Sequence, residues 1–205
     1  MRTLVLLLLA AVLYGCSSEP QKPAETPQPK ASATPAAPEL MTGRTAFYEM
    51  YRKARTWAPD AKPYRLESST TKETEGKAVV WHASFASPSR RSVKPYTWSG
   101  GGENAPEKGV SFGPDDTFNP SNASTQPFDA NFLKTDSDNA YKVAQEKGGA
   151  ELEKKHAGTP VTYVLDWSPK ANELIWHVSY GETTQDYKLK IAVNASTGGY
   201  LRKEK

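Results

Sequence analysis

The sequence has little cysteine and no strong excess of charge of either sign. One cysteine in 205 residues excludes a disulfide framework and any cysteine-rich metal site. Lysine and arginine number 26 against 23 aspartate and glutamate residues, so the net charge is only +3. Proteins dedicated to binding nucleic acid usually carry a concentrated basic patch, so no nucleic-acid partner is expected. The chain is still long enough to bury a hydrophobic core in one or two small domains.

The apolar run near the N-terminus is too short to cross a membrane. It covers residues 4–13, whereas a membrane-spanning helix needs about 20 apolar residues. With Arg2 before it, the run is typical of the h-region of a secretory signal peptide. Gly15 and the single cysteine, Cys16, follow where cleavage is expected, and this arrangement resembles a bacterial lipobox, in which the cysteine is diacylated. The alternatives are an ordinary signal peptide with a chance cysteine, or a free reactive thiol.

The lipobox resemblance predicts an exported, lipid-anchored protein. Residues 1–15 are expected to be a lipoprotein signal peptide, with the mature chain anchored in the membrane through acylated Cys16. In Gram-negative lipoproteins, aspartate directly after this cysteine is associated with retention in the inner membrane. Ser17 stands there instead, which predicts the outer membrane of a bacterial cell envelope, facing the periplasm.

A proline-rich segment follows the cysteine. Residues 17–39 hold six of the 16 prolines and no aromatic or large aliphatic side chain. Such a segment cannot bury enough apolar surface to offset the entropy of folding, and its prolines favour an extended backbone. We predict a lipid-anchored linker over residues 16–40 that holds the globular part away from the bilayer. A proline-rich ligand for a recognition domain is the alternative.

Beyond residue 40, one helix pattern and three strand patterns occur twice in the same order. Apolar residues repeat at helical spacing over 45–58, with Thr42 as a candidate cap and Pro59 ending the helix. A second helix is expected from a cap at Asp136, interrupted by two glycines. The predicted strands are residues 64–69, 78–85 and 92–98 in the first half and 161–167, 173–180 and 186–194 in the second.

The two halves also match in detail. The sequence VWHASF at residues 80–85 corresponds to IWHVSY at residues 175–180, and a proline precedes the first strand of each half. We therefore predict a tandem repeat, with a first α+β module over 41–120, a connecting loop over 121–135 and a second α+β module over 136–205.

The second half, about residues 139–202, resembles a PepSY-type domain. The resemblance is carried by the capped helix, the strand at 174–178 and the closing run IAVNASTGGY at 191–200, which is similar to the strand and Thr-Gly turn of that family. It implies an α+β fold of two tandem helix-on-antiparallel-sheet modules, PepSY- or cystatin-like, with the first module a degenerate copy. PepSY modules carry no catalytic residues of their own, so the resemblance implies none here. Modules of this family inhibit secreted metallopeptidases or bind partners in the cell envelope.

Alternation along the matching strands predicts a candidate binding face. Trp81 and Trp176 should point toward the helices, and a histidine and a serine of each strand toward the opposite face. These four residues are His82, Ser84, His177 and Ser179. A Ser–His pair suggests nucleophilic catalysis, but no Gly-x-Ser-x-Gly elbow is present. Alternatively, His82 and His177 could bind one metal ion, with His156 as a third ligand. The simplest interpretation is that these four side chains are ordinary polar residues on the exposed face of a sheet.

Two further features concern the surface. Residues 100–132 are expected to form a long loop attached to the core by Phe112, Phe118 and Phe128. Basic residues form scattered patches, which normally indicate solvated strand edges, although attraction to anionic cell-surface material is an alternative. They are Arg90, Arg91, Lys94, Lys188, Lys190, Arg202, Lys203 and Lys205.

These observations predict a non-enzymatic envelope lipoprotein without a cofactor or a metal ion. The leading hypothesis is a module that binds a peptide or protein through an exposed sheet edge and inhibits or regulates a secreted peptidase. A structural or assembly lipoprotein without inhibitory activity is the second hypothesis, and an envelope hydrolase is the third.

Overall fold

The computed structural model describes residues 37–72, 75–122 and 126–204. The predicted signal peptide, Cys16 and the linker up to residue 36 lie outside the described residues. Every helix within the described ranges is too short or too polar to span a bilayer.

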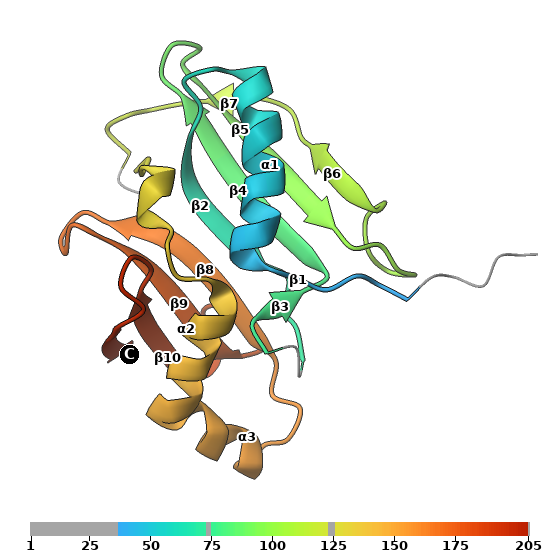
Figure 1. The fold of residues 1–205 in the computed structure, drawn as a ribbon, viewed down its shortest axis with the longest axis vertical. Helices are drawn as coiled ribbons and strands as arrows, with labels where there is room; N and C mark the ends of the chain where they lie inside the picture. Colours follow the sequence, from blue (N-terminus) through green and yellow to red (C-terminus); the bar gives the residue numbers. More distant parts are fainter. Residues whose placement is uncertain (1–36, 73–74, 123–125, 205) are drawn as a thin grey trace, which may run out of the picture. The chain divides into compact units, whose positions relative to one another are not determined.

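The described residues form one large antiparallel sheet with helices on one of its faces (Figure 1). The strand order is β11-β10-β9-β8-β2-β4-β5-β6, β7 pairs with β5, and a separate two-stranded ribbon joins β1 to β3. This architecture confirms the predicted α+β class with an antiparallel sheet. The strands are β1 (Met41–Thr42), β2 (Lys62–Ser68), β3 (Lys77–Ala78), β4 (Val80–Ser87), β5 (Ser92–Ser99), β6 (Gly109–Phe112), β7 (Asp116–Thr117), β8 (Val161–Ser168), β9 (Glu173–Gly181), β10 (Tyr187–Asn194) and β11 (Tyr200–Glu204).

Helix α1 (Gly43–Trp57) packs on β2, β4 and β5 through the apolar stripe that its periodicity predicts. Ala58, just after the helix, is extended with a φ of −145°, because the proline that follows it disfavours helical backbone. The stripe buries Ala46, Phe47, Met50 and Ala54 completely.

Helix α2 (Ser137–Ala144) begins at the predicted cap and packs on β9 and β10. A wider turn, Gln145–Gly149, joins it to α3 (Ala150–Lys155). Gly148 has a φ of +121°, a backbone conformation that glycine adopts without steric cost. Gly148 therefore turns the chain between two helices, and the predicted interruption of the helix at this glycine pair is confirmed.

The centre of the core is a pair of tryptophans, Trp81 of β4 and Trp176 of β9. Both are fully buried, and their ring centroids lie 6.3 Å apart at an interplanar angle of 71°. A Cβ atom at Gly43 would lie 2.7 Å from Cη2 of Trp176 and 2.8 Å from Cη2 of Trp81, so glycine is what lets α1 begin directly over both rings. Each indole N–H donates to a carbonyl at 2.9 Å, Trp81 to Met41 and Trp176 to Thr135.

The start of α1 is capped by residues that lie far away in the sequence. Thr42 occupies the N-cap position, but, contrary to the prediction, its side chain makes no capping hydrogen bond. The Gly43 N–H donates to Ser137 Oγ at 2.7 Å, and the Arg44 N–H donates to Asp136 Oδ1 at 2.8 Å. Because the Asp136 side chain also accepts from the Ser137 N–H at the start of α2, this one carboxylate serves the N-termini of both helices.

The segment 100–132 is only partly the predicted loop. It contains β6, β7 and the short 3-10 helix Ala130–Phe132. Phe118 and Phe128 are buried as expected, but the prediction for Phe112 is wrong, because this side chain is 66% exposed. Phe112 belongs to β6, the last strand at one edge of the sheet, and so has a neighbouring strand on one side only.

Candidate functional site

The sheet face opposite the helices carries a row of interacting polar side chains. Helices cover the other face (Figure 1), so this row is not buried beneath α1, α2 or α3. We call the row the polar ladder. It consists of Arg202 and Glu204 of β11, His177 of β9, Asp166 of β8, and Arg65 and Glu67 of β2.

His177 lies in the middle of the ladder because of strand alternation and register. Its neighbour Trp176 points toward the helices, so His177 points to the opposite face, as predicted. His177 Nδ1 lies 2.7 Å from Glu204 Oε2, and His177 Nε2 lies 3.3 Å from Asp166 Oδ1. Ala192 of β10 is opposite His177, and its small methyl group leaves room for Glu204 to reach across β10.

The two carboxylates favour the charged form of the imidazole. Burial by itself lowers the pKa of His177, whose side chain is 14% exposed, but the hydrogen bonds and charges of Asp166 and Glu204 outweigh burial and raise the pKa above its ordinary value. Burial likewise acts to raise the pKa of Glu204, but the hydrogen bond and charge of His177 overcome it and lower this pKa to about 2. His177 therefore links β8, β9 and β11 as a charged bridge.

The ladder continues across the pairing of β8 with β2. Arg65 Nη1 lies 3.3 Å from Asp166 Oδ2, and Arg65 Nη2 lies 2.9 Å from Glu67 Oε2. These side chains are about one-third exposed, and single ion pairs of this kind stabilise a fold by only ~0–1 kcal/mol. Their main consequence is an alternation of charge along the row, which leaves Arg65 between two carboxylates.

A hollow of about 360 Å³ opens beside the ladder. Ser179, two residues after His177 on the same face of β9, is fully buried, and its Oγ has no hydrogen-bond partner among the described residues. Both ring nitrogens of His177 are engaged by carboxylates, so the Ser–His hydrogen bond that nucleophilic catalysis needs is not formed. The hollow is lined by Arg65, Val164, Asp166, His177, Thr184, Gln185 and Lys190.

The other two residues of the predicted binding face lie elsewhere on the sheet. His82 and Ser84 are on β4, and two strands, β8 and β2, separate β4 from β9. At about 4.8 Å between neighbouring strands, the two histidine backbones are about 14 Å apart. His82 Nδ1 lies 3.0 Å from Thr97 Oγ1, and burial lowers the pKa of His82 although Glu67 opposes this. His82 and Ser84 therefore do not share one site with His177 and Ser179.

The structure also does not bring together the three histidines that the sequence analysis considered as possible ligands of one metal ion. His82 and His177 are too far apart to bind one ion, and His156 lies after α3 beside a different hollow, with Gly158 and Lys188. Over the described ranges there is no group of three histidine, cysteine, aspartate or glutamate side chains that fits a metal ion.

Sequence reasoning singled out His177 for the candidate face, noted Arg202 only as a basic surface residue and missed the other four ladder residues. Alternation in β2 places Arg65 and Glu67 on one face with Leu66 between them on the other, and this signal is readable in the sequence. Asp166 and Glu204 become partners of His177 only through the strand order and register.

The charged bridge predicts how stability depends on pH. Because the pKa of His177 is raised on folding, its contribution is fully present below its ordinary value of 6.5 and is lost as the pH rises through the folded value. We expect the free energy of unfolding, measured with urea, to be about 1 kcal/mol higher at mildly acidic than at mildly alkaline pH. In His177→Gln this difference should shrink, whereas His82→Gln should not shrink it, because burial lowers the pKa of His82 and its effect on stability has the opposite sign. An unchanged pH difference in His177→Gln would show that the bridge does not carry it.

The carboxylate partner has the opposite pH dependence. Because the pKa of Glu204 falls from 4.5 to about 2 on folding, its contribution is present above 4.5 and is lost as the pH falls through 2. The ladder is therefore strongest in the mildly acidic range, where His177 is protonated and Glu204 is ionised.

Comparisons with known proteins identify no relative of this chain. The chain matches no protein-family model, no curated protein and no solved structure.

Proposed function

We propose that this chain is a lipoprotein of the bacterial outer membrane, anchored through Cys16, whose globular part binds a peptide or protein without catalysing a reaction. The apolar run at residues 4–13, the single cysteine after Gly15 and the proline-rich segment that follows support the anchor and the linker. The described residues begin at 37, where the Glu39 N–H donates to the Gly100 carbonyl at 3.1 Å. The linker would thus lead directly to the sheet.

We further propose that the globular part is a pair of tandem modules of PepSY-like build. A helix followed by β2, β4, β5 and β6 occurs in the first half, and a helix followed by β8, β9, β10 and β11 occurs in the second. In each half the central tryptophan donates its indole N–H to the carbonyl of the residue just before a helix cap. The pairing of β2 with β8 would be the seam between the modules.

The observation that carries the binding proposal is the open sheet. Strands β6 and β11 end the strand order, so each has a backbone edge to which an extended peptide can add hydrogen bonds. Phe112 on β6 is 66% exposed and Tyr200 on β11 is 43% exposed, and aromatic side chains at such positions commonly anchor binding partners. A secreted peptidase held at such an edge would be inhibited or regulated.

A capture experiment tests this proposal. The chain with residues 1–16 replaced by an affinity tag is incubated with envelope extract, and retained proteins are identified by mass spectrometry. We expect one specific partner whose retention is lost when proline replaces a residue whose backbone N–H points away from the sheet, Val110→Pro on β6 or Lys203→Pro on β11, because proline removes a free edge donor.

The other outcomes separate the competing functions. A partner retained equally by both proline variants would point to an assembly role through another surface and would contradict edge binding. Inhibition of secreted peptidases by the tagged protein at micromolar concentration would support the regulatory role. If no protein is retained and no peptidase responds, the binding proposal fails.

A further inference from the structure

The two edges of the sheet differ in chemistry. Strand β6 (Gly109–Phe112) has no charged side chain, whereas β11 (Tyr200–Glu204) contains Arg202, Lys203 and Glu204. A partner that adds to β11 must therefore be compatible with a charged edge, and one that adds to β6 need not be.

The charge at the β11 edge is positive in excess. The one carboxylate on this strand, Glu204, is occupied by His177 at 2.7 Å, Lys190 at 3.6 Å and Arg202 at 2.6 Å. Within the part of the chain that the structure describes, no ion pair joins Lys147, Lys188 or Lys203 to a carboxylate, although the charge of Lys203 acts on Glu151 of α3, whose own ion pair is with Lys155. All three side chains are exposed.

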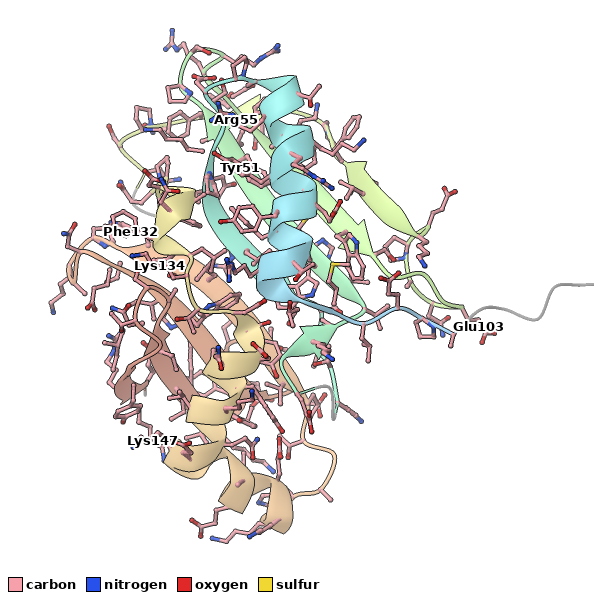
Figure 2. All side chains as sticks on the ribbon, in the orientation of Figure 1. Tyr51, Arg55, Glu103, Phe132, Lys134 and Lys147 are labelled. Carbon is pink, nitrogen blue, oxygen red and sulfur yellow. The ribbon has the colours of Figure 1, made fainter. Side chains whose placement is uncertain are left out.

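Two of these lysines approach the edge from the helix side. Lys147 extends from the turn between α2 and α3 (Figure 2), and its Nζ lies 5.2 Å from the ring centroid of Tyr200, the first residue of β11. Lys203 pairs in register with Ile191, whose side chain is buried on the helix side, so Lys203 lies on that side as well. Arg202, one residue earlier, lies on the opposite side with the polar ladder.

We propose that β11 binds an extended, acidic segment of a partner protein, which adds to the sheet as a further strand. This rests on the function proposed above and specifies which edge is used and what chemistry it selects. The backbone of β11 supplies the hydrogen bonds, while Lys147 and Lys203 attract carboxylates that alternate along one side of the added strand.

The same positive charges would oppose pairing of β11 with a second copy of itself. Lysines on an edge strand oppose association with another strand of like charge, which is the usual reason for their presence. An acidic strand meets no such repulsion, so the charge that rejects a second copy selects the acidic partner.

The test uses the full mature chain with Cys16→Ser and a fluorescein-labelled, capped hexapeptide of alternating glutamate and valine. We expect binding by fluorescence anisotropy that weakens as salt is added, together with slower hydrogen exchange at the amides of β11. The paired variant Lys147→Glu/Lys203→Glu should bind about tenfold more weakly. Lys53→Glu, an exposed charge reversal on α1, should bind like the wild type.

Two further variants and one further peptide decide between edge pairing and charge attraction. Lys203→Pro should abolish binding and Val110→Pro, the matched removal of an outward N–H on β6, should not. If Val110→Pro alone abolishes binding, if a glutamate–proline hexapeptide binds equally well, or if the glutamate–valine peptide fails to bind at millimolar concentration, the inference is wrong. A partner captured from envelope extract that requires β6 would likewise overturn the choice of β11 while leaving the proposed function intact.

Discussion

Replacing Trp176 with alanine is expected to lower the free energy of unfolding by about 3–5 kcal/mol. The side chain is fully buried, its ring contacts the ring of Trp81, and its Cη2 lies under the start of α1 at Gly43. Alanine would leave a large cavity where the helices meet the sheet. It would also leave the Thr135 carbonyl without the indole donor that now lies 2.9 Å away.

Urea unfolding of a matched series checks this expectation. Trp81→Ala should cost a similar amount, because Trp81 is equally buried and also donates to a carbonyl. Trp167→Ala is the control, since Trp167 is half-buried and packs near the surface against Phe132. A loss in Trp176→Ala no larger than that in Trp167→Ala would contradict the central position assigned to the indole pair.

The double variant provides a second readout. Because the Trp81 and Trp176 rings are in edge-to-face contact, the two single losses should not add, and the coupling should be about 0.5–1.5 kcal/mol. Strict additivity would mean that the two rings stabilise separate parts of the fold.

Much of the fold could be predicted from the sequence because its main signals are local. The apolar spacing over 45–58 predicts α1, and strand alternation correctly assigns Trp176 and His177 to opposite faces. Strands β6 and β11 were not predicted. The first is four residues long and the second five, and neither carries an alternation long enough to stand out from the surrounding glycine-rich or basic sequence.

The candidate site was only partly predictable because its contacts join distant residues. His177 could be singled out, but its partners Asp166 and Glu204 lie 11 and 27 residues away in the chain. Strand alternation predicts the face on which a side chain lies, whereas its neighbours on that face depend on strand order and register. The same limit explains the wrong expectation for Thr42, since the residues that cap α1 lie on α2 and just before it.

Replacing Ser137 with alanine is expected to lower the free energy of unfolding by about 2–4 kcal/mol, a large effect for the loss of one hydroxyl group. The Ser137 Oγ accepts from the Gly43 N–H at 2.7 Å and donates to the Gly76 carbonyl at 2.5 Å, and the residue is fully buried. Its removal would leave two backbone groups without a partner and detach the start of α1 from the start of α2.

Urea unfolding and hydrogen exchange measure this effect together. Ser196→Ala is the matched control, because its hydroxyl makes one hydrogen bond, to the Phe132 carbonyl at 2.7 Å, at an exposed position, and its loss should cost less than about 1 kcal/mol. In Ser137→Ala, the Gly43 amide should exchange faster than in Ser196→Ala, since it loses its acceptor. If the two variants have equal stability and Gly43 remains protected, the Ser137 hydroxyl is not needed, and the hydrogen bond to Asp136 together with the core beneath Gly43 suffices to join the two helix starts.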